Sequence, residues 1–475
     1  MPACVRANSA GMIIVFLCPW VIMMTSKMSD IKQQLERLKK ERETRSKAQI
    51  IRDTWDQIEK KEDIPLKEKL DRLITLTREE KPKPKKSVPF EPLRREPLKF
   101  FENPFSLSTK YGKIHLSRGL EIKGDILTCL SKDEAFNRLD LSTALFVDLE
   151  TTGLSGGTGV IPFLVGLGYY RDNKFWVVQY FLGDLAEEER MIQELDQFFM
   201  SMDFQSVVTY NGKGFDIPLL ETRFILHKQP FRLASLPHLD FLYSARSLWK
   251  HKHESCQLYH LSRQVVEADR SEDIPAAEIP WRYFQYLQTG NFDLIESVLY
   301  HNQEDILSLL GVVIVGSFIC AEGKEEDLAD AMDLFGAGRV MENIGDVEKS
   351  VHFYERALSG DLSDEVTLMA KRKVSHYFKK NNKWKDALAY WKEIASSPWV
   401  CPAQLYSLRE LAMYFEHRKK DYEEAIKQAE EGFILSRGVS TYYEKDFSYR
   451  LERLRHKIKK KRLKPRVSDL KNFSA

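Results

Sequence analysis

The chain has 475 residues and a formal net charge of +2, with 43% hydrophobic and 30% charged residues. The length favours about two to four domains, and the apolar fraction is sufficient for globular cores. A net charge near zero excludes a global basic field, so a nucleic-acid function requires a local signal. The six cysteines include no CxxC pair, which argues against a zinc ribbon or a disulfide framework and favours a reducing compartment; we expect a cytoplasmic protein.

The first 27 residues contain an apolar run at 12–25 that follows Arg6. The run is short for a membrane span but long enough for the core of a signal peptide. No clear cleavage site follows it, and Met28 opens a charged segment. We therefore expect residues 1–27 to be a doubtful extension ahead of a true start at Met28. A signal or membrane anchor is the alternative, and we expect no stable membrane association.

Residues 28–142 fall into two stretches of different composition. Residues 28–86 are rich in Lys, Glu, Arg and Leu, which predicts surface helices, and they end in a basic linker that prolines keep from being helical. Residues 87–142 have a mixed composition, and we expect them to be a lead-in that docks on the following domain.

Residues 143–321 show the pattern of an α/β domain. Short turns join three apolar segments, which predicts an antiparallel meander. Strand–helix alternation follows and predicts further, parallel strands, so the expected fold is a mixed sheet flanked by helices. The strands are expected at 144–149, 161–170, 174–181, 205–210 and 236–242, and the helices among them at 187–200 and 215–227.

Residues 327–440 are expected to be all-helical and repetitive. Three segments align, with Ser350, Ala387 and Ala425 at the same small-residue position. Their spacing is a little longer than the roughly 34-residue tetratricopeptide period, which predicts about three imperfect repeats whose helix pairs cover one another's apolar faces. Residues 441–475 are expected to be a basic tail, which is usually solvated and less often binds phosphate backbones.

The first strand of the α/β domain ends in two carboxylates, Asp148 and Glu150. Residues two apart in a strand point to the same face, so these acids would lie side by side. Burial and like charge both oppose that arrangement unless a cation offsets it, and hard oxygen donors suit Mg²⁺ or Mn²⁺. The alternative is a strand that runs into a polar turn with both acids solvated.

Two later segments contribute further chemistry. Asp216 opens a helix after a strand and a glycine loop, at the edge where sites of α/β sheets collect, although it could simply cap that helix. His301 and Asp305 are four residues apart in an expected helix and so share a face, a pairing that is also common on solvated helices.

Together these positions resemble the DEDD exonucleases of the DnaQ-like, ribonuclease H-like superfamily. They look most like its YprB-type bacterial subfamily, in which such a domain precedes tetratricopeptide repeats. The resemblance covers roughly residues 90–435 and is most specific in the nuclease core. The segments that carry it are 146–159 (Phe-Val-Asp-Leu-Glu-Thr-Thr-Gly-Leu-Ser-Gly-Gly-Thr-Gly), 210–220 (Tyr-Asn-Gly-Lys-Gly-Phe-Asp-Ile-Pro-Leu-Leu), 279–290 and 301–309.

The resemblance implies a two-metal hydrolysis of phosphodiester bonds. Asp148, Glu150, Asp216 and Asp305 would hold two Mg²⁺ or Mn²⁺ ions, which activate a water and stabilise the leaving oxygen. His301 is the expected base or water-orienting group. The sequence departs from the family here, since the histidine branch places its His five residues before the last Asp, where this chain has Tyr300. Whether His301 or Tyr300 assists the water therefore stays open.

The segments around the acids suggest contacts to substrate. We expect a 3′-5′ exonuclease that acts on single-stranded DNA or RNA. One alternative is a nucleic-acid-binding scaffold with weak or no catalysis whose repeats dock a protein partner; another is a structure-specific endonuclease on the same fold. The residues expected to bind substrate are Thr151, Thr152, Gly153, Asn211, Lys213 and Phe215.

Overall fold

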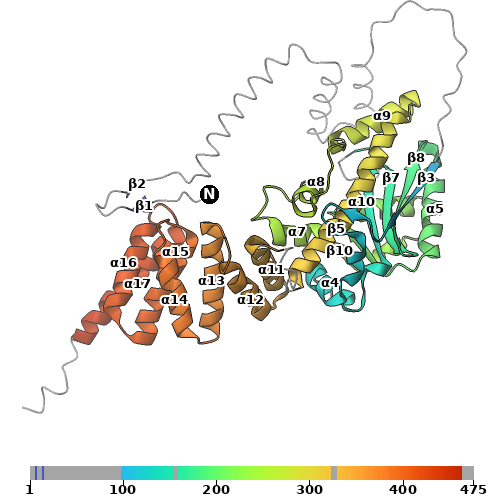
Figure 1. Cartoon of the computed structure of the whole chain (residues 1–475). Helices are drawn as coiled ribbons and strands as arrows, with labels where there is room; N and C mark the ends of the chain where they lie inside the picture. The colour runs from blue at the N-terminus through green and yellow to red at the C-terminus, as the bar shows by residue number, and fades with distance from the viewer. Residues whose placement is uncertain (1–5, 8–12, 15–97, 154–158, 322–328, 463–475) are drawn as a thin grey trace, which may run out of the picture. The chain divides into compact units, whose positions relative to one another are not determined.

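A computed structural model describes residues 6–7, 13–14, 98–153, 159–321 and 329–462 of the chain (Figure 1). The predicted start at Met28, the charged segment and linker of 28–86, and the end of the basic tail lie outside these residues. The chain divides into two compact units, Leu93–Ile394 and a second that combines Met1–Pro92 with Ala395–Ala475. In the second unit, β1 (Arg6–Ala7) pairs with β2 (Ile13–Ile14).

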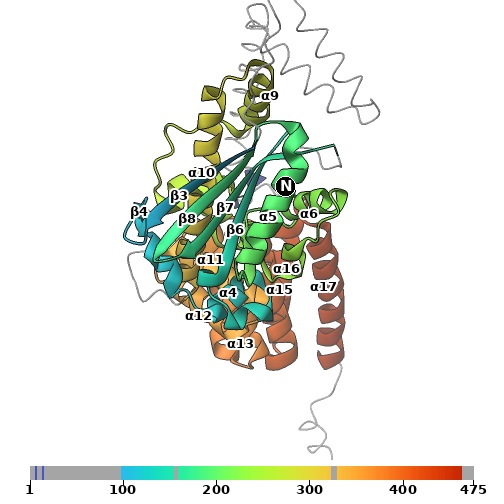
Figure 2. The same ribbon diagram turned by 90° about the vertical axis from the view of Figure 1, so that its right-hand side faces the viewer.

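A six-stranded mixed sheet organises the first unit, in the order β10-β9-β6-β7-β8-β3. Figure 2 shows β6, β7, β8 and β3 side by side. Neighbouring strands from β6 through β7 and β8 to β3 are antiparallel, whereas β9 is parallel to β6 and β10 is parallel to β9. The predicted meander and the two parallel strands that follow it are therefore confirmed. The strands are β3 (Leu98–Ser106), β6 (Ala144–Thr151), β7 (Pro162–Arg171), β8 (Lys174–Leu182), β9 (Ser206–Thr209) and β10 (His238–Asp240).

A two-residue turn joins β7 to β8. Asp172 and Asn173 have φ angles of 50° and 56°, in the left-handed region that tight hairpin turns require and that Asp and Asn tolerate. Both strands are almost entirely buried, as expected for central strands that are covered on both faces. The turn thus explains how β7 and β8, two of the three segments of the meander, pair directly.

The sixth strand, β3, lies in a region that the sequence predicts only as a docking lead-in. It pairs with β8 along its whole length, from Leu98 opposite Leu182 to Ser106 opposite Lys174. Pro104 interrupts the strand pattern in the sequence because proline cannot donate a ladder hydrogen bond, yet it is tolerated because β3 is an edge strand. Burial alternates along β3, so one of its faces is covered and the other is exposed.

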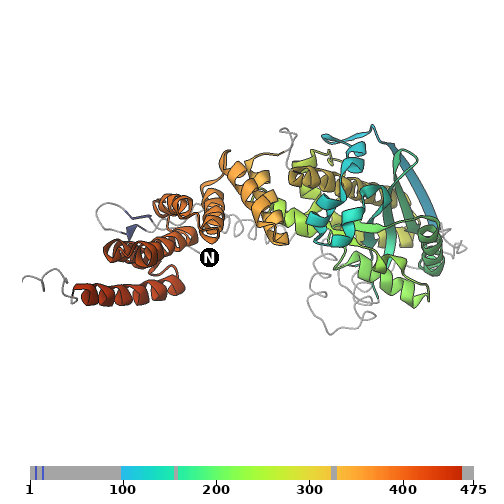
Figure 3. The ribbon, with the colours of Figure 1, turned by 90° about the horizontal axis from the view of Figure 1, so that it is seen from below.

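Helices cover both faces of the sheet over two separate cores (Figure 3). On β6, Leu145 and Val147 belong to one core and Phe146 to the other, as the two-residue period of a strand requires. The core of Leu145 includes residues of α5 and α6, and the core of Phe146 includes residues of α10. Since Asp148 and Glu150 continue the period of Phe146, they lie on the α10 face. These helices are α5 (Glu188–Ser201), α6 (Asp216–Leu226) and α10 (Asp293–Cys320).

Helix α10 is the most apolar long helix of the described residues. Its length and a mean hydropathy of 1.7 would suffice for a membrane span, but 83% of that apolar window is buried within the protein. The helix contacts β6, β7 and β8 and also α7 (Phe241–Trp249) and α9 (Ile279–Thr289). Its composition is thus accounted for by its place in the core, and polar residues within it need specific partners.

The C-terminal region is helical, as expected, and each unit contains part of it (Figure 1). In the first unit α11 packs against α12 and α12 against α13, and in the second α15 packs against α16 and α16 against α17. Ser350, Ala387 and Ala425 are all buried. The assignment of these helix pairs to tetratricopeptide repeats stays a prediction. Helix α17 occupies the first part of the expected basic tail. The helices are α11 (Ala331–Ile344), α12 (Val347–Leu358), α13 (Asp364–Lys380), α14 (Trp384–Ala395), α15 (Pro402–Tyr414), α16 (Tyr422–Ser436) and α17 (Thr441–Arg462).

Candidate metal centre

Asp148 and Glu150 lie at the end of β6, beneath α10. Asp148 is opposite Gly166 of β7 in the antiparallel pair, and Glu150 is opposite Leu164. Burial raises the pKa of both carboxyl groups well above the ordinary value, and neighbouring carboxylates raise it further. For Asp148 these neighbours are Asp305 and Asp216, so acids from separate segments of the chain converge at this point.

Asp216 reaches the same place from the first turn of α6. It is 8% exposed, and burial raises its pKa to about 7 even though two backbone N–H groups donate to its carboxylate. The N-cap position of α6 belongs to Phe215, so the alternative in which Asp216 only caps the helix is wrong. The chain therefore buries this acid close to Asp148 without using its side chain to cap the helix.

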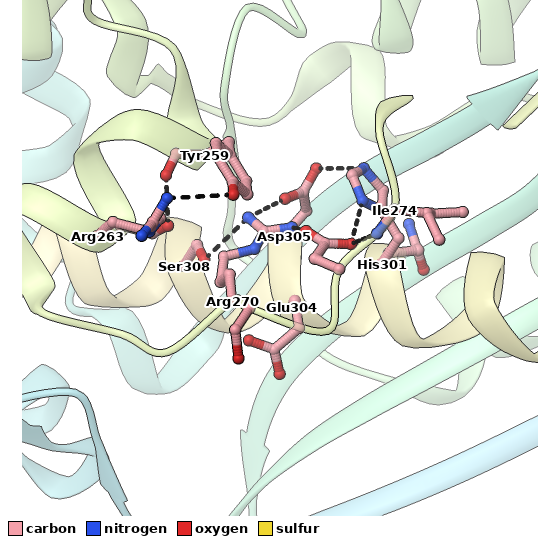
Figure 4. Close-up of polar contacts among 12 residues, drawn as sticks. Tyr259, Arg263, Arg270, Ile274, His301, Glu304, Asp305 and Ser308 are labelled. Carbon is pink, nitrogen blue, oxygen red and sulfur yellow. Dashed lines mark hydrogen bonds and ion pairs between the residues drawn. The ribbon is translucent and has the colours of Figure 1, made fainter. Parts of the chain in front are cut away.

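His301 and Asp305 both project from α10 (Figure 4). The Nε2 atom of His301 lies 3.4 Å from Oδ2 of Asp305 and 3.7 Å from Oε1 of Glu150. One donor atom from each of these three residues falls within 4.8 Å of the other two, so the three form a group that could hold a metal ion. The shared helix face predicted for His301 and Asp305 is therefore confirmed.

Arg270 and Asp273 complete this group, and the sequence gives no sign of either. The Nδ1 atom of His301 lies 2.6 Å from Oδ1 of Asp273, whose side chain is fully buried. Arg270, also fully buried, donates through one terminal nitrogen to Oδ1 of Asp305 at 2.5 Å and through the other to Asp273. Figure 4 shows Arg270 beside Asp305, with His301 on the other side.

These contacts set the charge states of the α10 residues. Burial lowers the pKa of His301, but the hydrogen bond to Asp273 and the facing carboxylates of Asp305 and Glu150 outweigh burial and raise it to about 11. Burial likewise raises the pKa of Asp305, yet His301 and Arg270 outweigh it and lower the value. Asp305 is thus the best compensated of the four acids, whereas the other three have raised pKa values.

The buried side chain of Asn302, from α10, bridges Gln179 of β8 and Asp148 of β6. The sequence does not predict a role for it. Its amide Nδ2 donates to Oδ2 of Asp148 at 2.8 Å, and its Oδ1 accepts from Nε2 of Gln179 at 2.8 Å. The side chain is wholly buried and passes over Gly166, where any Cβ atom would lie 2.2 Å from Asn302 Oδ1. Gly166 therefore leaves room for the residue that orients Asp148.

The expected substrate-binding residues fall into two groups. Thr151 donates its hydroxyl to the carbonyl of Gly153 at 2.8 Å, and Thr152 accepts from the backbone N–H of Ile161 at 3.0 Å, so both hydroxyls are engaged within their own loop. Phe215 packs against the core of α6. Asn211 and Lys213, by contrast, have exposed side chains.

The carboxylate of Asp240 binds the backbone of the loop that carries Asn211 and Lys213. The backbone N–H groups of these two residues donate to its carboxylate at 2.8 and 3.1 Å, and Asn211 has a φ of 69°.

Tyr300 is next to His301 in α10. After burial, the charged groups that most affect the pKa of its hydroxyl are Glu304 and Asp273 rather than the strand acids. The geometry thus favours His301 over Tyr300 as the residue that faces the site.

The donor set fits a divalent cation. Asp148, Glu150 and Asp216 present carboxylate oxygens in a largely buried place, where burial raises the pKa of each carboxyl group and neighbouring carboxylates raise it further. Carboxylate oxygens are ligands that Mg²⁺ and Mn²⁺ prefer. The residues that could hold ions are therefore the four predicted acids, with His301 beside them.

Comparisons with known proteins give one family model and two similar proteins. A family model described as the RNase_H superfamily matches residues 145–315. The "Uncharacterized protein YprB" of Bacillus subtilis (strain 168) is 32% identical over 319 residues, which cover 66% of this chain and 74% of that protein. A solved family B DNA polymerase from the hyperthermophilic archaeon Pyrobaculum calidifontis is 17% identical, with a TM-score of 0.30, and the match covers 45% of this chain and 29% of the polymerase.

Proposed function

Because the chain belongs to the ribonuclease H superfamily and to the same family as YprB, we propose that it is a metal-dependent 3′-5′ exonuclease that hydrolyses single-stranded nucleic acid. The observation that carries the proposal is the convergence of Asp148, Asp216 and Asp305 from β6, α6 and α10, with Glu150 beside them. An α/β fold alone would not distinguish a nuclease from many other proteins, whereas this set of acids supports phosphodiester chemistry.

In this proposal the four acids hold two divalent cations. When bound, such cations would supply Lewis acidity, which lowers the pKa of a water and offsets negative charge on the leaving oxygen of a phosphodiester. The protein's own residues bind and orient: Asn302 fixes one oxygen of Asp148, and Arg270 fixes one oxygen of Asp305. Fixed ligands matter because catalysis by positioned charges depends on little rearrangement during the reaction.

The exposed loop before Asp216 is the proposed contact to substrate. Asn211 and Lys213 are exposed there, while Asp240 holds the loop backbone from below. A lysine ammonium and an amide suit a phosphate group, and neither reads base identity at such a position. This supports a substrate whose backbone, rather than its sequence, is recognised.

The test is degradation of end-labelled single-stranded DNA and RNA in the presence of Mn²⁺, with wild-type protein and Asp148→Ala. We expect a ladder that ends in mononucleotides for wild type and at least about a hundredfold loss for Asp148→Ala, because one ligand and its charge are removed. The matched control is Asp172→Asn, which removes an aspartate charge from the β7–β8 turn. Asparagine tolerates the left-handed φ of that turn, so activity should be retained.

The alternatives give different results in the same assay. Cleavage of a circular single strand would identify an endonuclease. No cleavage of any substrate by wild-type protein, with unfolding transitions that match between variants, would refute the exonuclease and favour a nucleic-acid-binding scaffold.

A further inference from the structure

The imidazole of His301 is held in one orientation. It is 5% exposed, and its Nδ1 atom lies 2.6 Å from the fully buried carboxylate of Asp273. That bond leaves Nε2 directed at Asp305 and Glu150, at 3.4 and 3.7 Å. Both separations exceed the roughly 2.7–3.2 Å of a well-formed N–H···O hydrogen bond, so Nε2 lies between two carboxylate oxygens rather than bonded closely to either.

This arrangement is typical of a histidine that binds a metal. Histidine ligands usually donate their other ring N–H to a carboxylate or carbonyl, which fixes the tautomer and aims the free nitrogen at the ion. Two ligand atoms at about 2.1 Å from one ion can be at most about 4.2 Å apart. The distances from His301 Nε2 to Asp305 and to Glu150 meet that condition.

Arg270 adds a constraint on Asp305. It binds Oδ1 of Asp305 and also Asp273, so the same guanidinium braces a strand-facing acid and the carboxylate that orients His301. Only Oδ2 of Asp305 is then turned toward His301. The bracing favours a single oxygen from Asp305 and leaves an adjacent ligand position for the imidazole nitrogen.

We propose that His301 is a metal ligand which, with Glu150 and Asp305, forms a mixed nitrogen–oxygen site that selects Mn²⁺ over Mg²⁺, and that Asp273 is its positioning residue. The proposal rests on the proposed function, since it concerns one of the same cation sites. Imidazole nitrogen is a good ligand for transition metals, whereas Mg²⁺ favours oxygen ligands and retains water. A nitrogen ligand therefore raises the affinity of the site for Mn²⁺ relative to Mg²⁺.

The test reads the ligand directly, without catalysis. Pulsed electron paramagnetic resonance of the Mn²⁺-loaded full chain detects ¹⁴N coupling when an imidazole nitrogen is bound. We expect ¹⁴N coupling in wild type, its loss in His301→Gln, and its retention in His115→Gln, an exposed histidine that bonds to the backbone of Ser108. Asp273→Asn should weaken Mn²⁺ binding about 10- to 100-fold in calorimetric titration, the usual cost of losing the partner that orients a histidine ligand.

Metal selectivity gives a second readout. His301→Gln should lose at least about tenfold in Mn²⁺ affinity and much less in Mg²⁺ affinity, because glutamine offers an oxygen in place of nitrogen. Wild-type protein that binds Mn²⁺ without ¹⁴N coupling would overturn the proposal, as would full coupling in His301→Gln.

The outcome is separable from that of the exonuclease assay. Coupling without cleavage would support the ligand and refute the nuclease, whereas cleavage without coupling would refute the ligand and return His301 to the role of a base. A protein that binds no Mn²⁺ at all would overturn both.

Discussion

Gly166→Ala should weaken metal binding although it changes none of the acids. Gly166 lies on β7, opposite Asp148 of β6, and contacts the Asn302 side chain that bonds to Asp148. A Cβ atom at this position would lie 2.2 Å from Oδ1, 2.6 Å from Nδ2 and 2.7 Å from Cγ of Asn302. All three atoms belong to one buried amide that bonds to Asp148 and to Gln179. The amide must therefore move, and both of its partners lose a hydrogen bond in a place that water does not reach.

The magnitude follows from two contributions. Overpacking of a tight core costs about 1–3 kcal/mol of unfolding free energy. Leaving a buried polar group without its hydrogen bond costs about another 1–3 kcal/mol. We expect a total loss of about 2–6 kcal/mol. We also expect Mn²⁺ affinity to fall about tenfold or more, since partners that orient a metal ligand usually contribute that much.

Gly168→Ala is the matched control, two residues along the same strand and on the same face. Its Cβ would meet Ile306 Cγ2 at 2.5 Å and Phe175 Cζ at 2.8 Å, so it overpacks an apolar contact and leaves Asn302 in place. Urea unfolding should show a loss of stability for both variants, and calorimetry should show weakened Mn²⁺ binding for Gly166→Ala alone. Equal Mn²⁺ affinity in the two variants, or a Gly166→Ala protein as stable as wild type, would refute the role assigned to Asn302.

Three further predictions address metal binding and stability. Mn²⁺ at a free concentration a hundred times its dissociation constant should stabilise wild-type protein against urea by about 2.7 kcal/mol and should stabilise Asp148→Ala much less. Arg223→Met should cost about 3–5 kcal/mol in urea unfolding, because it leaves the carboxylate of Glu188, 8% exposed, without its buried arginine, while Mn²⁺ affinity in calorimetry stays unchanged. Burial and Lys213 lower the pKa of His238 to about 4, so the unfolded chain binds a proton near pH 6.5 that the folded protein refuses, and stability falls as the pH drops between these values. His238→Gln should remove that loss, and the difference in unfolding free energy between pH 7 and pH 5 should shrink by about 2 kcal/mol; an unchanged difference would contradict the assignment.

Much of the sheet is predictable because its signals are local. Apolar runs of strand length and the Asp172-Asn173 turn define the meander before any tertiary contact is considered. β3 is not predicted as a strand, because Pro104 interrupts its apolar pattern and its partner, β8, is distant in sequence. Edge strands are stabilised by such non-local pairing, and a local sequence pattern does not reveal it.

The acids are predictable for the same reason, and their supporting residues are not. Asp148 and Glu150 follow the period of a strand, and His301 and Asp305 follow that of a helix. Arg270 and Asp273 lie in an irregular segment between Ser262–Val266 and Ala276–Glu278, which has no period from which a facing direction could be inferred. Only the folded chain brings them to α10.

The role of Asn302 cannot be predicted from the sequence for a different reason. It is one residue from His301 and so points about 100° away around α10, which from sequence alone places it off the functional face. The helix lies across β6 and β7, however, so two of its sides reach the sheet. His301 meets Glu150 while Asn302 meets Asp148, and a single helical stripe cannot describe both contacts.

The balance of charge around the site bears on how many cations it holds. Five carboxylates surround it, from the four predicted acids and Asp273, and Arg270 supplies one fixed positive charge. Glu304 does not belong to this group, since it accepts from Tyr111 and points away from His301 and Asp305 in Figure 4. Five negative charges against one positive charge leave four when His301 is neutral, as a metal-bound imidazole must be. One divalent ion would leave an excess of two negative charges in a largely buried place, whereas two would neutralise it, so the charge balance supports a pair of cations.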